Sequence, residues 1–459
     1  MKIGWASVDI TPERPVVLRG QFHARISNRV NDPLLATALV LSEESAGEHV
    51  VMVSCDRVSI PSGILQRVRE AVASRAKGLD ARRVFLNATH THTAPEIEEG
   101  HYPPQGPEVM TPTEYADLFV DRVAECIARA WENQAPGAVG WGFGQAVVGH
   151  NRRASYFGGV SRMYGATNTP EFEQIEGYED HGVDLLYTWD PEGRLTGMIV
   201  NLACPSQVTE GEHYVSADFW HEVRVELARR VGEGLFLLPQ CSAAGDQSPH
   251  LLLHARAEER MRRLRGVTER EELARRIVDA VTDVLPVAET EKHSDVPLRH
   301  AVRTLHLPAR AVTRDEYEHA VREYETYERQ QVPEGNVAGF SRRFRMLNRY
   351  RRVMERYRSQ GEQPTFAVET HLVRVGDVGF ATNPFELFLD FGERIKARSK
   401  AVQTFVVQLA GGGAAYLPTA RAVAGQGYGA EPVSNHVGPE GGQVLVEESL
   451  AMLNAFWEE

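Results

Sequence analysis

The stretch Asn87-Ala88-Thr89-His90-Thr91-His92-Thr93-Ala94-Pro95 directly follows the apolar run Val84-Phe85-Leu86. The apolar run predicts a buried strand, and in an extended chain residues two apart point to the same side. The imidazoles of His90 and His92 should therefore face one space. Neutral imidazole is the commonest protein ligand for zinc, so the pair predicts a metal and substrate site. The alternative is that both rings only form hydrogen bonds at a loop edge.

The composition is that of a soluble globular protein, with 42% hydrophobic and 25% charged residues. The net charge of −13 argues against nucleic-acid binding, because phosphate contacts need an excess of lysine and arginine. No apolar stretch has the length of a membrane span, so we expect no stable membrane insertion. The N-terminus lacks the apolar region of a signal peptide, which favours a cytoplasmic location. The four cysteines form no Cys-x-x-Cys pair, which argues against a disulfide framework.

Strand-like and helix-like periods alternate along the chain. We predict strands at 49–54, 83–87, 198–203, 235–238, 378–382 and 405–409, and amphipathic helices at 62–77 and 113–133. This pattern indicates an α/β fold, with parallel or mixed β-sheets covered by helices, in one domain spanning residues 1–459. Ligands of such folds bind beyond the carboxyl ends of the strands. Polar residues follow these strands at Asp56, His90, His92, Cys204, Asp246, Ser248 and Glu386.

A charged helical hairpin is predicted at 311–361. Its first helix is acidic and begins at the capping box Thr313-Arg314-Asp315-Glu316. The second helix is basic and carries Arg342, Arg343, Arg345, Arg349, Arg351, Arg352, Arg356 and Arg358. One interpretation is a patch for an anionic polymer or a membrane. The interpretation that we prefer is a hairpin whose acidic and basic faces attract each other.

Three further segments bear polar groups that are weak signals alone. In Gly245-Asp246-Gln247-Ser248-Pro249, Ser248 could be a nucleophile, an oxyanion donor or a turn former. In Asn383-Pro384-Phe385-Glu386, Glu386 could be a metal ligand, a base or an acid at a helix N-terminus. Tyr416 and Tyr428 lie in glycine-bordered loops, where tyrosines more often serve packing.

Together these segments resemble the catalytic domain of neutral/alkaline ceramidases, without a counterpart of that family's C-terminal immunoglobulin-like domain. Residues 89–95 match the family's Thr-His-Thr-His-Ser-Gly-Pro segment, and 245–249 match Gly-Asp-x-Ser-Pro. Residues 384–386 match Pro-x-Glu, and 415–419 resemble Gly/Ser-Tyr-Val-Thr-Thr. An Ile-Gly-x-Ala-x-x-Asp-Ile-Thr pattern stands at 3–11. The segments follow the same order along nearly the whole chain.

The resemblance implies one zinc ion, with His90, Glu386 and Tyr416 among its ligands. The family's second histidine ligand is missing from the segment 200–207, which reads Val-Asn-Leu-Ala-Cys-Pro-Ser-Gln. Cys204 could replace it as a thiolate. His221, at the start of the next predicted helix, is the replacement that we prefer. The alternative is a site that binds metal weakly, binds another metal or binds none.

The resemblance also implies roles around the metal. His92 would hydrogen-bond the substrate, and Arg152 would contact and orient it. Ser248 would be the active-site serine, and Tyr428 would face the reacting carbonyl. Asp246 is expected to hold Ser248 or a histidine in place.

We therefore expect a zinc-dependent hydrolase that cleaves an amide, N-acyl bond through a metal-activated water. The hairpin and the lack of an evident apolar groove favour a small polar substrate over ceramide itself. The alternative is a carbohydrate-active hydrolase or lyase, with a glycan substrate and Glu386 paired with Asp218 or Glu222. A third reading is a non-enzymatic scaffold that binds through the arginine-rich helix. A homo-oligomer is compatible with the sequence.

Overall fold

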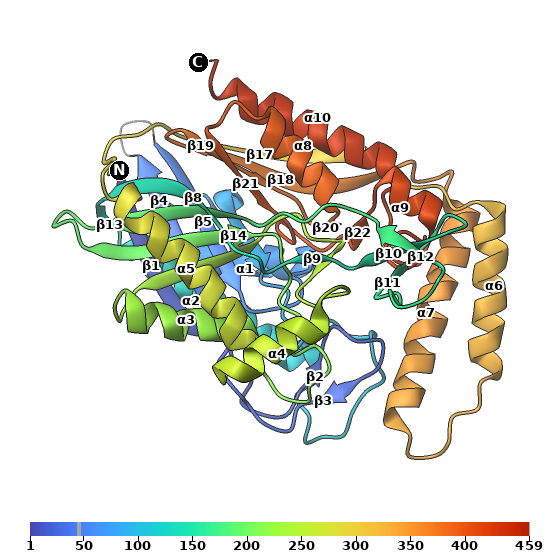
Figure 1. The fold of residues 1–459 in the computed structure, drawn as a ribbon. Coiled ribbons are helices and arrows are strands. Elements are labelled where there is room, and N and C mark those ends of the chain that lie inside the picture. The colour runs from blue at the N-terminus through green and yellow to red at the C-terminus, as the bar shows by residue number, and fades with distance from the viewer. Residues whose placement is uncertain (44–46, 459) are drawn as a thin grey trace.

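Three large β-sheets form the body of the protein in the computed structural model, which describes residues 1–43 and 47–458 (Figure 1). The first sheet has the order β6-β5-β4-β1-β7. Its strands are β1 (Lys2–Asp9), β4 (Leu35–Glu43), β5 (Glu48–Cys55), β6 (Val84–Ala88) and β7 (Ala135–Pro136). The second sheet has the order β15-β14-β13-β8, with β8 (Ala138–Gln145), β13 (Gly182–Trp189), β14 (Leu195–Leu202) and β15 (Phe236–Cys241).

The third sheet has the order β17-β18-β19-β21. Its strands are β17 (Leu298–Pro308), β18 (Thr365–Val375), β19 (Val378–Thr382) and β21 (Gln403–Val407). Each large sheet contains one parallel pair, which is β5 with β6, β14 with β15, and β19 with β21. Antiparallel neighbours complete each sheet. The expectation of an α/β fold with mixed sheets is therefore confirmed, and each large sheet owes its parallel character to one strand pair.

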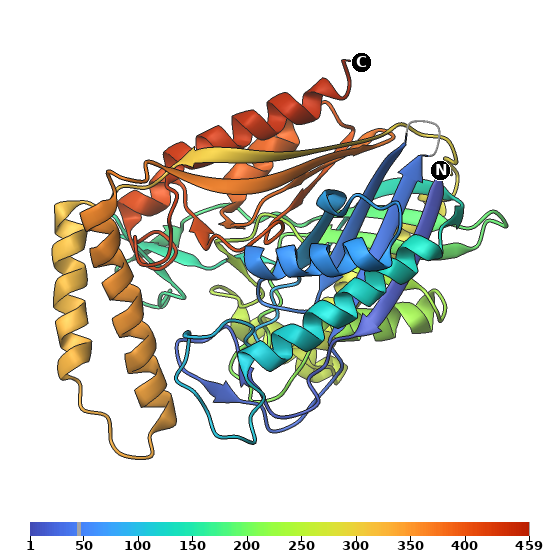
Figure 2. The ribbon, with the colours of Figure 1, turned by 180° about the vertical axis from the view of Figure 1, so that it is seen from behind.

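The inner faces of the three sheets share one apolar core, which includes Trp5, Leu39, Phe85, Ile199 and Phe380. Each outer face is covered by two helices (Figures 1 and 2). These are α1 (Ser62–Arg75) and α2 (Pro112–Glu132) on the first sheet, α3 (Phe219–Arg230) and α5 (Glu269–Ala288) on the second, and α8 (Leu389–Arg398) and α10 (Pro439–Ala455) on the third. Strands buried on both faces explain the near-continuous apolar runs in the sequence.

Short strand pairs beside the large sheets place the polar segments. Strand β9 (His150–Asn151) pairs with β16 (Gln247–Ser248), and β20 (Glu386–Leu387) pairs with β22 (Tyr416–Leu417). The remaining elements are β2 (Val17–Leu18), β3 (Arg25–Ile26), β10 (Arg153–Tyr156), β11 (Val160–Met163), β12 (Phe172–Ile175), η1 (Ala81–Arg83), α4 (Ala255–Arg265) and α9 (Ala420–Gly425). No helix within residues 1–43 and 47–458 combines the length and the hydropathy needed to cross a bilayer.

Helices α6 (Arg314–Arg329) and α7 (Val337–Ser359) stand side by side at one end of the molecule (Figure 1). They pack through aromatic rings, with Tyr317 stacked on Tyr357 at 4.5 Å between ring centroids. In the described part of the chain, no ion pair joins α6 to α7. Glu318 and Glu325 of α6 form ion pairs with arginines of the same helix, and Glu316 pairs with Arg310 just before it. The expectation that opposite charges hold the two helices together is wrong, because apolar and aromatic contacts occupy the face between them.

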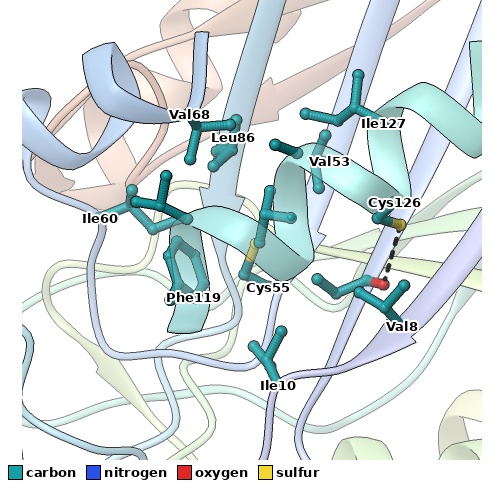
Figure 3. Packing of buried hydrophobic residues seen from close by; sticks show 14 of the residues in the cluster. Val8, Ile10, Val53, Cys55, Ile60, Val68, Leu86, Phe119, Cys126 and Ile127 are labelled. Atoms are coloured by element: carbon teal, nitrogen blue, oxygen red, sulfur yellow. Dashed lines mark hydrogen bonds between the residues drawn. The ribbon is translucent and has the colours of Figure 1, made fainter. Parts of the chain in front are cut away.

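The outer core of the first sheet contains Phe119 of α2, which is fully buried against Ile60, Cys55 and their neighbours (Figure 3). Helix α2 begins with a complete capping box at Thr111 and Glu114, and it places one apolar face on the sheet. Phe119 therefore connects the strands whose ends bear the histidine pair to the helix layer outside them.

We predict that Phe119→Ala lowers the free energy of unfolding by about 3–5 kcal/mol, because it removes buried surface and leaves a cavity. The matched control is Glu125→Ala on the exposed side of the same helix, which should change stability by less than about 0.5 kcal/mol. Urea unfolding followed by circular dichroism measures both. Equal stability of the two variants would contradict this packing.

Candidate functional site

A cavity of about 390 Å³ lies where the loops after the strand ends meet. Residues expected from the sequence line it on one side, namely His90, His92, Glu386, Tyr416 and Tyr428. Arginines line other parts of its wall, namely Arg19, Arg345, Arg349, Arg352 and Arg356. The crevice expected at the carboxyl ends of the strands is therefore present, and the hairpin contributes to it.

The two histidines converge for a different reason from the one that the sequence suggests. Strand β6 ends at Ala88, and His90 has a left-handed backbone with φ of 67°. The pair therefore lies in a loop and not in an extended strand, so period-two alternation does not orient the rings. Their Nε2 atoms are nevertheless 3.2 Å apart. A left-handed non-glycine residue is strained, and such strain is common at functional sites.

The proton on His90 is placed by a backbone contact. Nδ1 of His90 lies 2.7 Å from the carbonyl oxygen of Val58, so it must carry the hydrogen that it donates. In the neutral ring, Nε2 then presents a lone pair, and this atom lies 3.4 Å from Oε2 of Glu386. Burial opposes ionisation of Glu386, but His90, Tyr416 and Arg152 outweigh it and lower its pKa to about 2. Two electron-rich atoms face each other, an arrangement that a cation between them or a proton on His90 would stabilise.

Tyr416 stands opposite Glu386 in the β20–β22 pair, and its hydroxyl hydrogen-bonds the carboxylate. Nη2 of Arg152 donates to the same hydroxyl at 3.1 Å. Burial and the charge of Glu386 raise the pKa of Tyr416 well above its usual value, so the phenol keeps its proton in this arrangement. The hydroxyl therefore accepts from Arg152 and donates to Glu386.

The donor set fits a zinc ion. Ligand atoms about 2.0–2.1 Å from a tetrahedral zinc lie about 3.3 Å from one another. The separation of 3.4 Å from Nε2 of His90 to Oε2 of Glu386 matches that edge length. Zinc-binding histidines also commonly donate the other ring N–H to a carbonyl, as His90 does to Val58. Within the described residues, no group of three or more His, Cys, Asp or Glu side chains could hold a metal, so a zinc shell here needs the phenol of Tyr416.

Two residues that the sequence reasoning missed contact His92. Oε1 of Gln207 accepts from Arg152 at 3.3 Å, which turns the Gln207 amide nitrogen toward Nε2 of His92 at 2.8 Å. On the other side of the ring, Nδ1 of His92 lies 3.4 Å from Oε2 of Glu210. Burial lowers the pKa of His92 to about 4, so the ring is neutral near pH 7 and its Nε2 accepts from Gln207.

Cys204 and His221 do not reach this group of residues. The thiol of Cys204 lies 3.6 Å from the Val148 carbonyl, in the apolar core beneath α3, where burial raises its pKa well above its usual range. His221 lies half-buried in the first turn of α3, and neither residue is among those that line the cavity. The chain turns at Pro205 after β14 and delivers Gln207 instead. The sequence analysis considered only an imidazole or a thiolate as the replacement ligand. No sequence pattern singled out the amide of Gln207.

Ser248 and Asp246 are buried and are not among the residues that line the cavity. Oγ of Ser248 is fully buried and accepts from the Tyr164 hydroxyl at 3.0 Å and from the His250 backbone N–H at 3.1 Å. The Asp246 carboxylate accepts from the Leu389 backbone N–H and from the Asn151 side chain, each at 3.0 Å. It therefore fixes a turn between two elements, and the expectation that it holds Ser248 or a histidine is wrong.

Arg152 is buried against protein groups. Besides Tyr416 and Gln207, its guanidinium donates to the Gly245 carbonyl at 2.8 Å. These contacts orient two residues of the site, and Arg152 is not among the residues that line the cavity, so its contact with substrate stays a prediction.

The carboxylates expected opposite Glu386 for glycosidic cleavage are engaged elsewhere. Asp218 caps the N-terminus of α3 and accepts from the backbone and hydroxyl of Thr209, each at 2.7 Å. Glu222 accepts from Arg270 at 2.6 Å. Neither is among the residues that line the cavity.

Comparison with solved structures identifies the fold. A neutral ceramidase from Pseudomonas aeruginosa matches with a TM-score of 0.71 and 19% sequence identity, over 100% of this chain and 74% of that chain. A ceramidase complexed with C2 matches with a TM-score of 0.70 and 18% identity, over 100% of this chain and 75% of that chain. No family model and no curated protein sequence matches the chain. The expected ceramidase catalytic-domain fold is confirmed by structure.

We predict that Arg152→Met destabilises the protein by about 1–3 kcal/mol, because it leaves the buried carbonyl of Gly245 and the hydroxyl of Tyr416 without a donor. Arg256→Met, on the exposed surface of α4, is the control and should change stability by less than about 0.5 kcal/mol. Guanidinium unfolding compares them. A fully stable Arg152→Met protein would show that these contacts are not formed.

Proposed function

We propose that this protein is a metal-dependent hydrolase that cleaves an amide bond of the N-acyl type. The observation that supports this most directly is the lone pair of His90 Nε2 facing the Glu386 carboxylate, with Tyr416 and His92 beside them. The shared fold with ceramidases supports amide cleavage as the reaction.

His90, Glu386 and Tyr416 would hold one Zn²⁺, as their separations and the His90 tautomer allow. When bound there, zinc would polarise the scissile carbonyl and bring the pKa of a coordinated water toward neutrality. Cys204 and His221 take no part in this proposal, because they lie outside the cavity lining.

His92 is proposed as the proton acceptor. Its Nε2 accepts a hydrogen bond from Gln207 and lies beside His90, so it can take a proton from a nucleophile at that point. The Glu210 carboxylate next to Nδ1 would stabilise the imidazolium that forms, and His92 would then return the proton to the leaving amine. A positioned acid–base group of this kind contributes about 10²–10⁴-fold to rate.

Tyr428 and Arg152 would act around the reacting carbonyl in different ways. The Tyr428 ring lines the cavity 5.4 Å from the Tyr416 ring, so its hydroxyl is our candidate donor to the developing oxyanion. Arg152 is a positioning residue that holds Tyr416 and Gln207. Ser248, whose hydroxyl is tied to Tyr164, would support the wall behind them.

We predict that His90→Ala loses zinc and hydrolytic activity together, because the imidazole is the first donor of the proposed set. Zinc is measured by plasma mass spectrometry, and activity as amine release from short-chain N-acyl amides. His306→Ala, an exposed histidine of β17, is the control and should retain both. A His90→Ala protein with full zinc and full activity would refute the assignment.

We predict that a chelator lowers both the melting temperature and the activity, and that Zn²⁺ restores them while Mg²⁺ does not, since Mg²⁺ prefers an all-oxygen shell. A metal ion at a free concentration of 1,000 times its Kd would contribute about 4 kcal/mol to the stability of the folded state. Oligosaccharides should be screened in parallel with the N-acyl amides. Metal-independent turnover, or cleavage of oligosaccharides alone, would overturn the proposal.

A further inference from the structure

Four arginines of α7 face the cavity that contains His90 and Glu386. They are Arg345, Arg349, Arg352 and Arg356, here called the α7 ridge. Their spacing of four, three and four residues places them along one side of the helix. Eleven residues of helix rise by about 16 Å, so the ridge runs along a full wall of the cavity.

Within the described part of the chain, the ridge has no acidic partner. No ion pair there involves any of its four arginines. The cavity lining contains two carboxylates, Glu98 and Glu386, and Glu386 already belongs to the His90 group. Arg19, the fifth arginine of the lining, differs from the ridge because it is paired with Glu96 at 2.5 Å.

Several ridge nitrogens are buried without a hydrogen-bond acceptor among the described residues. They are Nε and Nη1 of Arg345, Nε of Arg349, and Nε and Nη2 of Arg356. Burial, together with the charges of Arg19 and Arg349, lowers the pKa of Arg345 to about 10, which still leaves it charged at neutral pH. Buried donors without acceptors are rare in proteins, and unpaired buried charges more so. Among the described residues, these buried nitrogens have no negatively charged oxygen atom as a partner.

Aromatic rings and not acids contact two of the ridge arginines, and Nη1 of Arg356 donates to the Asn435 carbonyl at 2.6 Å. The guanidinium carbon of Arg345 lies 5.2 Å from the centroid of the Tyr102 ring. That of Arg349 lies 5.2 Å from the centroid of the Phe22 ring and 5.8 Å from that of the Tyr428 ring. Tyr428 in turn contacts Tyr416. Only the Tyr428 ring therefore separates Arg349 from Tyr416. A ligand bound at Arg349 would also reach the proposed reacting groups.

We propose that the α7 ridge binds an oxyanionic group, a carboxylate or a tetrahedral sulfate or phosphate, and that the hydrolase therefore acts on an acidic N-acyl compound. The anion-binding part stands on the ridge alone, and the substrate class rests on the proposed function. Guanidinium groups match both kinds of oxyanion with paired N–H donors. The net charge of −13 means that anion attraction arises from this wall and not from the molecule as a whole.

The test measures anion binding without turnover. Succinate and inorganic phosphate are titrated separately into the zinc-loaded protein by calorimetry, at fixed ionic strength in sodium chloride. We expect at least one probe to bind, and Arg345→Gln/Arg349→Gln to weaken it by at least tenfold. Arg352→Gln, whose side chain is exposed, serves as a second variant in which loss of folding is not expected. Arg351→Gln, an exposed arginine of α7 outside the cavity lining, should bind as the wild type does.

Each outcome decides the proposal. Binding of succinate alone assigns a carboxylate, binding of phosphate alone assigns a tetrahedral anion, and binding of both assigns a site that accepts either oxyanion. Absence of binding by both probes, or binding that both ridge variants leave unchanged, overturns it.

Turnover separates this inference from the proposed function. We expect an N-acyl compound with an acidic group to have at least tenfold higher kcat/KM than its neutral amide analogue, and the double variant to remove that preference. If neither compound is hydrolysed while the ridge still binds anions, the proposed function fails and the anion site stands. Equal kcat/KM for the two compounds would refute the acidic substrate class.

Discussion

Two buried amide side chains tie the three sheets together at the end where the site forms. Nδ2 of Asn87, in β6 of the first sheet, donates to the Pro239 carbonyl in β15 of the second at 3.0 Å. Nδ2 of Asn201, in β14 of the second sheet, donates to the Val406 carbonyl in β21 of the third at 2.8 Å. Both asparagines are fully buried, where an unpaired N–H or carbonyl is costly, and the Oδ1 atom of each has no hydrogen-bond partner among the described residues. The ends of the parallel strand pairs are thereby fixed relative to one another, and the loops with His90, Gln207 and Glu386 follow three of these strands, β6, β14 and β19.

This constraint brings together groups that would otherwise repel or distort. His90 adopts a left-handed backbone, as does Ala415 just before Tyr416. The lone pair of His90 Nε2 faces a carboxylate, and four arginines line the same cavity. The surrounding sheets hold these residues where isolated loops would relax. The same cavity therefore gathers the residues proposed to hold a cation and the arginines proposed to bind an anion.

Sequence reasoning was accurate where the signal was local. It predicted the apolar strands, the capping box at Thr313, and the motifs that gather His90, Glu386 and Tyr416. It failed at the strand end before Pro205, where Gln207 and not Cys204 reaches the site. It also failed for Asp246, whose carboxylate binds a backbone N–H from a distant helix. Both errors concern partners that lie far away in the chain.

The sequence by itself determined the strand and helix periods, the order of the polar segments and the chemical types available to the site, because these follow from the alternation and identity of neighbouring residues. Only the tertiary structure decided which atoms face each other. The Val58 carbonyl sets the His90 tautomer, Arg152 turns the Gln207 amide, and aromatic packing between α6 and α7 leaves the α7 ridge for the cavity. The reason is physical: a hydrogen bond or an unpaired charge depends on distance and burial, and these are set when separate sheets pack on one core.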